Sequence, residues 1–329
     1  MTIGAGTSKL GAIFKVRETG VFLALAAIFL FFTVLSPYFF NANNLINIFR
    51  QVSLLGIIAM GMTMVIVCGE IDLSVGSIYG ASAILCGVML TNGSSLWAAV
   101  LVGLATGLAF GFLNGWLVTY GRIPAMIVTL GMMNIARGFA LIVSNGRVVN
   151  LSARTVASPH LDLFLFSGQG KIGTIPVMSV IFIGIAVIAF IIYGRTLLGF
   201  HMKAVGGSNT AARASGINDR VVKIAAFSLV GLFAALAGLL NIAFLGNVQG
   251  TTGQGMEMNS IAAVIIGGTT LKGGEGTIIG TLIGVLIMGV LNNGIILLGI
   301  SPFWQMMIIG FVIIAAVAVD MWTRNGRAS

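Results

Sequence analysis

The side chains in this sequence that could carry out catalysis or bind a metal ion are few and scattered. The 329 residues include only two cysteines and two histidines, which are Cys68, Cys86, His160 and His201. No two of these have the spacing of a metal site. A phosphate-binding P-loop needs the pattern G-x-x-x-x-G-K-[ST], and no lysine in the chain has that context. We therefore predict a protein that is not an enzyme, without catalytic residues, a metal site or a nucleotide site of its own.

The acidic residues are equally sparse, and the eight of them lie between apolar segments or at their ends. Glu70 and Asp72 fall in a predicted cytoplasmic turn between two such segments, and Glu257 lies near the external start of another. Carriers driven by a proton or sodium gradient usually place acidic groups deep inside the helix bundle. The lack of a mid-span acid in the sequence disfavours such a carrier. The alternative stays open, because segment boundaries inferred from sequence shift by several residues.

Apolar helices are the elements that must position these residues. Hydrophobic residues make up 58% of the chain and charged residues only 8%, against about 25% charged residues in a soluble domain. A membrane-spanning helix needs about 20 predominantly apolar residues. The sequence therefore predicts an all-α polytopic membrane protein with about ten transmembrane helices in a single domain over 1–329. The predicted spans are about 19–36, 45–66, 74–91, 96–119, 124–143, 176–194, 221–245, 256–271, 277–298 and 303–321.

Basic residues set the predicted orientation, because cytoplasmic loops carry an excess of Lys and Arg. If the N-terminus is inside, 12 of the 17 basic residues face the cytoplasm, and only three face outward, all in the connection 144–175. We therefore predict that both termini are cytoplasmic and that 144–175 is external. The net charge of +9 follows from this distribution between apolar segments, so it does not indicate nucleic-acid binding.

Glycines recur at every fourth residue of the fourth predicted span, at Gly103, Gly107, Gly111 and Gly115. Such a stripe lets helix backbones approach closely in a membrane, where lipid supplies no hydrophobic driving force. The stripe predicts helix packing within one subunit, with a subunit interface or a sliding helix as alternatives.

The connection over about 195–220 is long and basic for a cytoplasmic link. Asn209 is placed to cap a short helix through 211–215, and Gly216 is placed to end it. A short helix at this face suits a groove on a partner, and the small Ala211 and Ala212 predict close packing there. The alternative is a solvated basic loop that only sets topology.

Short motifs in a fixed order run along nearly the whole chain. Those in the first half are Ser36-Pro37, Asn43-Asn44-Leu45, Gly61-Met62-Thr63, Ile71-Asp72-Leu73-Ser74-Val75-Gly76-Ser77, Ile123-Pro124-Ala125 and Thr129-Leu130. Those in the second half are Gly206-Gly207-Ser208-Asn209, Ala211-Ala212, Ser215-Gly216-Ile217, Ile261-Ala262-Ala263-Val264, Gly267-Gly268-Thr269 and Gly273-Gly274. In these motifs the sequence resembles the monosaccharide (ribose-type) branch of the ABC-importer permeases. One departure is Glu70, where the family usually has glycine.

This resemblance implies a function and a set of partners. Such permeases are inner-membrane subunits that pair with a second permease copy, bind two copies of an ABC ATPase at the cytoplasmic face and receive sugar from a periplasmic binding protein. The chain is accordingly expected to be a single permease domain, surrounded by lipid, that moves ribose or a similar sugar inward by alternating access. ATP and Mg²⁺ would bind to the partner ATPase, and the chain would need no cofactor. An ion-gradient-driven secondary sugar carrier is the alternative.

The resemblance also implies that 203–218 contacts the ATPase and couples its movement to transport. The residues expected to carry this role are Gly206, Gly207, Asn209, Ala211, Ala212, Ser215, Gly216 and Ile217.

A sugar pathway through the bundle needs hydrogen-bonding side chains and aromatic faces that bind only weakly, so that the sugar can leave. Arg137 lies near the middle of the fifth predicted span and needs a partner or water, so it either lines the pathway or is structural. Buried asparagines can equally bond a neighbouring helix. The pathway candidates are Asn114, Asn134, Arg137, Asn241, Asn292 and Asn293, with Phe112 and Phe244 as stacking faces.

Overall fold

Apolar helices form almost all of the structure. The computed structural model describes residues 17–151, 158 and 160–301, together with 304, 307, 308, 310, 311 and 314. The helices are α2 (Arg17–Leu35), α3 (Ala42–Val67), α4 (Val75–Thr91), α5 (Leu96–Thr119), α6 (Ala125–Val143), α7 (Leu161–Gln169), α8 (Val177–Arg195), α9 (Leu197–Gly207), α10 (Asn209–Ala214), α11 (Asp219–Leu245), α12 (Met256–Ile266) and α13 (Ile278–Leu297). The strands are β1 (Val149–Asn150), β2 (Lys171–Ile172), β3 (Ile175–Pro176) and β4 (Asn247–Val248). They form two antiparallel ladders, β1 with β4 and β2 with β3.

Eight of the predicted spans coincide with a helix to within three residues at either end. The eighth, predicted over 256–271, is instead the 11-residue α12, which stops at Ile266 because Gly267 and Gly268 follow it in a turn. Most of the tenth, over 303–321, lies outside the described residues, as do both termini. Six described helices are long and apolar enough to cross a membrane. The all-α polytopic class is therefore confirmed, whereas the number of spans and the side of the termini stay predictions.

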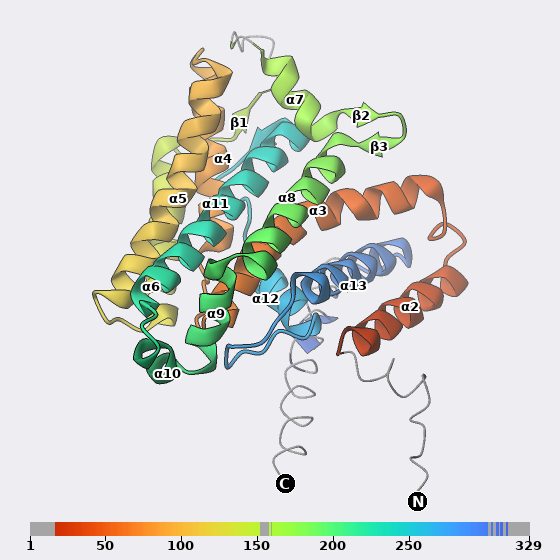
Figure 1. Cartoon of the computed structure of the whole chain (residues 1–329). Helices are drawn as coiled ribbons and strands as arrows, with labels where there is room; N and C mark the ends of the chain where they lie inside the picture. Colours follow the sequence, from red (N-terminus) through yellow and green to blue (C-terminus); the bar gives the residue numbers. More distant parts are fainter. Residues whose placement is uncertain are drawn as a thin grey trace, which may run out of the picture.

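The two long connections lie at opposite ends of the helix bundle (Figure 1). The described residues of 144–175 contain β1, α7, β2 and the start of β3 at one end, and residues 195–220 contain α9 and α10 at the other. The orientation inferred from the basic residues requires these connections to lie on opposite sides of the membrane. We call the end that carries α7 the outer end and the end that carries α10 the inner end.

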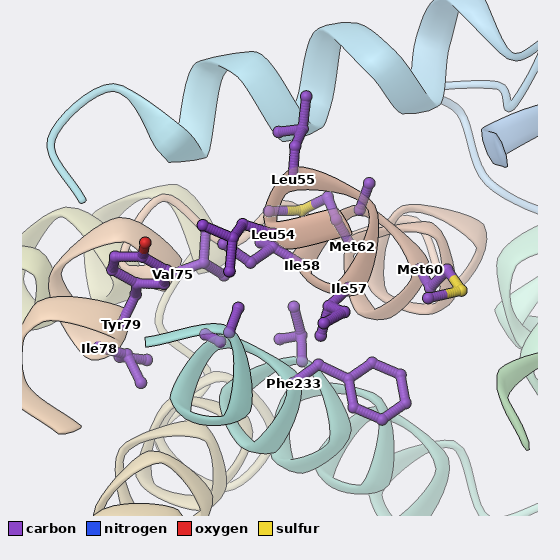
Figure 2. Packing of buried hydrophobic residues seen from close by; sticks show 14 of the residues in the cluster. Leu54, Leu55, Ile57, Ile58, Met60, Met62, Val75, Ile78, Tyr79 and Phe233 are labelled. Carbon is purple, nitrogen blue, oxygen red and sulfur yellow. The ribbon is translucent and has the colours of Figure 1, made fainter. Parts of the chain in front are cut away.

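The core of the bundle lies around α3 and α11. Every residue of α3 from Ser53 to Val67 is buried, which is expected for a helix that is apolar all round. Ile57 of α3, Ile78 of α4 and Phe233 of α11 belong to one buried cluster (Figure 2). By contrast, α5, α6 and α8 are mostly exposed and carry large apolar side chains on their outer faces, which suits contact with lipid or another subunit.

The glycine stripe of α5 packs against α11. A Cβ atom at Gly107 would collide with the carbonyl of Gly231, and one at Gly111 would collide with the carbonyl of Phe227. The absence of side chains on α5 therefore lets the two backbones touch. Of the alternatives left by the sequence, the structure favours packing inside one subunit for this stripe.

Candidate coupling surface and substrate pathway

The predicted coupling segment folds as two helices, α9 and α10, that meet at Ser208. The Ser208 Oγ atom accepts a hydrogen bond from the N–H of Ala211 at 3.3 Å and caps α10. The prediction that Asn209 is the cap is wrong by one residue, because Ser208 keeps an extended backbone while Asn209 is already helical. Gly216 ends α10 as predicted, with a φ of 82° in the left-handed region that commonly follows a helix.

The helix α10 exposes one face and buries the other. Thr210, Ala211 and Ala214 are exposed at the inner end or partly so, whereas Ala212 is only 4% exposed and packs within the chain. Neighbouring residues of a helix point about 100° apart, so the two alanines face different surroundings. The expectation that both pack against a partner therefore holds at most for Ala211. The accessible residues form what we call the α10 surface, which consists of Thr210, Ala211, Arg213, Ala214 and Ser215.

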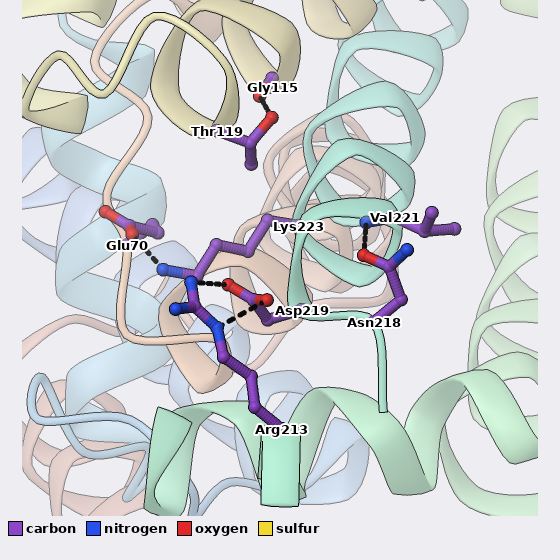
Figure 3. A network of polar contacts seen from close by, with 8 residues as sticks. All are labelled: Glu70, Gly115, Thr119, Arg213, Asn218, Asp219, Val221 and Lys223. Atoms are coloured by element: carbon purple, nitrogen blue, oxygen red, sulfur yellow. Dashed lines mark hydrogen bonds and ion pairs between the residues drawn. The ribbon is translucent and has the colours of Figure 1, made fainter. Parts of the chain in front are cut away.

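Two ion pairs connect the inner end of α11 to its neighbours (Figure 3). Arg213 of α10 donates to both carboxylate oxygens of Asp219, from Nε at 2.8 Å and from Nη2 at 2.7 Å. The hydrogen bonds and charge of this carboxylate raise the pKa of Arg213 above its ordinary value. Lys223 Nζ donates to Glu70 Oε1 at 2.6 Å, and both side chains are largely buried. These pairs fix α10 to α11, and α11 to the segment that follows α3.

A backbone junction connects α9 to two other segments. The N–H of Gly274 donates to the carbonyl of Val67 at 2.8 Å, and Gly206 lies so close to both groups that an added Cβ atom would collide with them. The end of α9, the end of α3 and the turn before α13 therefore meet at this point. Gly207, by contrast, is exposed and has open space where a Cβ atom would lie, so packing within the chain does not require glycine there.

Asp72 lies in the turn between α3 and α4, where the sequence predicts it, and this turn is packed into the bundle. Asp72 is fully buried, and its Oδ1 atom accepts from the N–H of Ser74 at 2.8 Å and from the Ser74 hydroxyl at 2.6 Å. Its Oδ2 atom accepts from Asn114 Nδ2 at 3.2 Å. Asn114 lies five residues, or about 7.5 Å, before the inner end of α5 at Thr119. The non-helical segment 68–74 therefore enters the bundle before α4 begins, and the buried Asn114 serves this network.

A second non-helical segment, 249–255, enters the bundle from the outer end. It follows β4, and Gly253 contacts Gly76 in the first turn of α4, while Thr252 contacts Gly80. Gly76 lies 15 residues and Gly80 lies 11 residues before the outer end of α4, which places the contacts about 16–22 Å below that end. The chain therefore crosses this part of the bundle first as a series of turns and then as the short α12.

Arg137 finds its partners in this segment. Its Nη1 atom donates to the carbonyls of Gly250 and Thr252, both at 2.8 Å. Arg137 lies six residues, or about 9 Å, before the outer end of α6 at Val143. A buried or half-buried cation at such a depth needs a partner, and here the partner is backbone. The side chain is half-buried, and its Nη1 atom also lies close to Gly80 of α4.

Glu257 lies near Arg137 but does not form an ion pair with it. It is in the first turn of α12, in contact with Gly76, and not at an external span end as the sequence predicts. Its Oε1 atom accepts from the N–H of Gly255 at 3.1 Å, and its Oε2 atom is buried. The carboxylate is close enough to interact electrostatically with Arg137. Both charged groups therefore bond the backbone of the 249–255 segment, and they interact with each other only at longer range.

Accessible polar side chains lie on α6 and on the 249–255 segment. We define the polar face as Asn134, Arg137, Gln249, Thr251 and Gln254. Asn134 is exposed one turn before Arg137 on α6, and the three residues of the 249–255 segment are accessible as well. Lipid cannot solvate such groups, so irregular backbone occurs at membrane depth only where it is buried in protein or lines a water-filled cavity. The polar face therefore requires water or a second protein in front of it.

The other predicted pathway residues lie elsewhere. Asn293 of α13 exchanges two hydrogen bonds with Asn44 of α3, at 2.9 and 2.8 Å. Asn241 is buried in α11, and Phe244 is half-buried with the guanidinium of Arg50 5.7 Å from its ring centre. Of the two remaining candidates, Asn292 lies on α13 and Phe112 lies on α5. Of the eight candidates, Asn134 and Arg137 are the pair that lies together on one face of α6.

Sequence reasoning missed the 249–255 segment. Its sequence, Gln-Gly-Thr-Thr-Gly-Gln-Gly, contains no apolar side chain and resembles an ordinary external loop. The usable signal is the length of the following helix, because 11 helical residues cover only about 16 Å of a hydrocarbon layer that is about 30 Å thick. The rest of that crossing has to be non-helical.

Comparisons with known proteins agree on a family. Residues 44–317 match the family described as branched-chain amino acid transport system / permease component. The chain is 42% identical to the ribose import permease protein RbsC of Escherichia coli K12, over 91% of this chain and 92% of that protein. It is 39% identical to RbsC of Bacillus subtilis over 92% of each chain. It is 33% identical to the autoinducer 2 import system permease protein LsrC of Photorhabdus luminescens, over 92% of this chain and 89% of that one.

The structure and these relatives point to the same class of protein. The described helices suit a multi-pass membrane protein, and the matched region includes α10, the 249–255 segment and Arg137. The chain therefore belongs to the branched-chain amino acid transport system / permease component family and is a multi-pass membrane permease of an ABC importer.

Proposed function

We propose that this permease is the membrane subunit of an ATP-driven importer for a monosaccharide, ribose or a similar sugar, in the bacterial inner membrane. The observation that carries the substrate class is the 42% identity, over 91% of the chain, with a ribose import permease. The family description also covers amino acid permeases, and LsrC takes autoinducer 2. The sugar assignment therefore rests on the more similar ribose permeases.

The sugar passes along the polar face. The amides of Asn134, Gln249 and Gln254 and the hydroxyl of Thr251 offer uncharged hydrogen-bonding partners to its hydroxyl groups, and Arg137 offers donors. Such partners bind a neutral solute weakly enough for release. A second permease copy on the other side of the pathway separates this face from lipid, which supports the proposal because exposed polar groups at membrane depth need such cover.

The α10 surface receives the ABC ATPase at the inner end. ATP and Mg²⁺ belong to that partner, so this chain acts as one permease domain without a cofactor. The ion pairs of Figure 3 and the junction at Gly206 connect α9 and α10 to α11 and to the 68–74 segment. A movement of α10 is thereby transmitted through direct contacts into the bundle. A periplasmic binding protein delivers the sugar at the outer end.

An ion-gradient-driven sugar carrier is the competing function. Such a carrier needs a titratable group or cation site in contact with its pathway. Asp72 is fully buried and accepts three hydrogen bonds, and in Glu257 the Oε1 atom accepts from the N–H of Gly255 while the Oε2 atom is buried. Neither acid is therefore placed to exchange ions with the polar face.

The deciding experiment measures how transport is energised. The permease is reconstituted with its partner ATPase and binding protein in vesicles, and uptake of labelled ribose is followed with ionophores that collapse proton and sodium gradients. We expect uptake that needs ATP hydrolysis and survives the ionophores. Ribose uptake by this chain alone, driven by an imposed gradient, would overturn the importer proposal. ATP-driven uptake of a different solute with ribose excluded would overturn the sugar assignment only.

A further inference from the structure

We propose that Arg137 is a built-in cation that keeps inorganic cations and protons out of the sugar pathway. The inference rests on the pathway proposed above, and it assigns to Arg137 a selectivity role beyond sugar binding. An importer that opens a polar path through the membrane has to pass a neutral solute without dissipating the ion gradients of the cell.

The first observation is the pair of carbonyls that Arg137 occupies. The carbonyls of Gly250 and Thr252 converge on a single nitrogen, Nη1, at 2.8 Å each. Within the described part of the chain, neither oxygen accepts a backbone hydrogen bond from a helix or a turn. Converging backbone carbonyls are the groups with which channels replace the hydration shell of a cation. Without Arg137, this pair would offer a partial cation site on the pathway.

The second observation is that Arg137 and Glu257 do not form an ion pair. The two Glu257 oxygens instead contact the N–H of Gly255 and Gly76. The positive charge of Arg137 is therefore only partly offset by this carboxylate. A cation in the pathway meets that charge, while a neutral sugar meets only hydrogen-bond donors.

The third observation is the depth of Arg137 in the bundle. Arg137 lies about 9 Å inside the outer end of α6, at a depth where lipid or protein, and not bulk water, surrounds the pathway. A fixed charge repels ions far more effectively there than at a water-exposed surface, because the effective dielectric constant is lower. In pores that conduct neutral solutes, a fixed arginine can exclude cations and protons by this electrostatic repulsion.

The first test measures the local potential with Arg137 intact. In Asn134→Cys, the new thiol lies one helical turn from Arg137, where side chains three residues apart are neighbours. The full importer is treated with an anionic and a cationic methanethiosulfonate of similar size, and each rate is divided by the rate of that reagent with a small free thiol. Because Cys68 and Cys86 are buried, the unsubstituted importer supplies the background.

We expect the normalised rate of the anionic reagent to exceed that of the cationic reagent about tenfold. Equal normalised rates, or a preference for the cationic reagent, would overturn the inference while leaving the pathway in place. If the thiol introduced by Asn134→Cys reacts with neither reagent from either side, that result would contradict the pathway itself, and with it the proposed function.

The second test measures leakage directly. Vesicles containing the importer with Arg137→Gln or Arg137→Lys are given an imposed membrane potential, and entry of sodium and protons is followed with ion-sensitive dyes. Gln keeps a donor for the two carbonyls and removes the charge, while Lys keeps the charge, so Lys is the matched control. We expect leakage to rise about tenfold in Arg137→Gln, which corresponds to about 1.4 kcal/mol, the repulsion between unit charges about 6 Å apart at an effective dielectric constant of about 40.

Leakage in Arg137→Lys should stay near that of the unsubstituted importer. Vesicles with Arg137→Gln that are as tight as the unsubstituted ones would overturn the inference. Equal leakage in both variants would also overturn it, because lost packing and not lost charge would then be the cause. If Arg137→Gln does not assemble, the thiol measurement on Asn134→Cys decides the inference alone.

Discussion

Substitutions at two neighbouring alanines of α10 allow contact with the ATPase and folding of the permease to be tested separately. Ala211 is exposed on the α10 surface, whereas Ala212 is 4% exposed and packs inside the chain. We expect Ala211→Asp to leave the permease folded and to abolish ATP-driven sugar uptake. Ala212→Asp should instead destabilise the permease itself. The same substitution at adjacent positions should therefore have two different effects, loss of the ATPase contact at position 211 and loss of stability at position 212.

The expected magnitudes follow from the two environments. At position 212, burying the carboxyl group as a neutral acid requires protonation at pH 7, about 3 pH units above its ordinary pKa, which costs about 4 kcal/mol. The alternative is to undock α10, which loses the packing of that helix. At position 211, the carboxylate lies in the first turn of α10, where the helix dipole favours a negative charge by about 0.3–1 kcal/mol. The permease alone should therefore tolerate Ala211→Asp, while an unpaired charge buried against a partner costs several kcal/mol.

The assay compares three quantities for each variant. These are the thermal midpoint of the purified permease in detergent, the amount of ATPase that co-purifies, and ATP-dependent ribose uptake in vesicles. Ala211→Asp should keep the thermal midpoint and lose co-purification or uptake, while Ala212→Asp should lower the midpoint. Normal uptake in Ala211→Asp would refute the assignment of the α10 surface. An unchanged midpoint in Ala212→Asp would refute the placement of Ala212 inside the chain.

Three further predictions concern the bundle. Asp72→Ala leaves three buried hydrogen-bond donations without an acceptor, and each unsatisfied group costs about 1–3 kcal/mol. The thermal midpoint of this variant should therefore fall well below that of the near-isosteric Asp72→Asn. Equal midpoints would contradict the network. Gly107→Leu should disrupt the α5–α11 contact and lower stability, whereas Gly138→Leu, on an open face of α6, should not, and the same thermal measurement checks both. A cysteine in place of the exposed Lys171 should react with an impermeant thiol reagent from outside, and one in place of Ser215 only from inside. The background should be low, because both native cysteines are buried and burial raises the pKa of the Cys68 thiol to about 12. Reversed labelling would contradict the predicted topology.

Much of the helical layout could be predicted from the sequence because long apolar runs are a direct signal. The fourth predicted span, 96–119, matches α5 at both ends, where Ser95 caps the helix. The glycine stripe could be predicted to mediate close packing, but its partner could not, because spacing on one helix does not say which helix faces it. Only the folded chain places Gly107 against Gly231.

The candidate site could be predicted only in part, for a physical reason. Asn134 and Arg137 could be singled out because a polar group in an apolar span is conspicuous. The burial of Asp72 and the path of the 249–255 segment could not be predicted, because sequence patterns detect helices, and polar residues next to glycine resemble an exposed loop. Here the non-helical backbone enters the bundle, where the contacts of Gly253 with Gly76 and of Asp72 with Asn114 depend on tertiary structure.

The same limit explains the error at α10. A sequence shows that Ser208, Asn209 and Gly216 can delimit a short helix, but not which of two polar residues accepts the capping hydrogen bond. With only six residues in the helix, no periodic pattern shows which side faces the bundle. The burial of Ala212 follows from how α10 docks onto its neighbours.

The most direct test of the central claim, that an ATP-driven sugar pathway follows the polar face, is thiol labelling at Gln254. Gln254→Cys places a thiol in the 249–255 segment next to Gly253, which contacts Gly76 deep in the bundle. Ile183→Cys, on the exposed apolar face of α8, is the matched control for a lipid-facing position. We expect a water-soluble thiol reagent to modify the Gln254→Cys importer and stop its ATP-dependent ribose uptake, while the Ile183→Cys importer stays unmodified. A thiol at position 254 that is inaccessible, or modified without loss of uptake, would contradict the account.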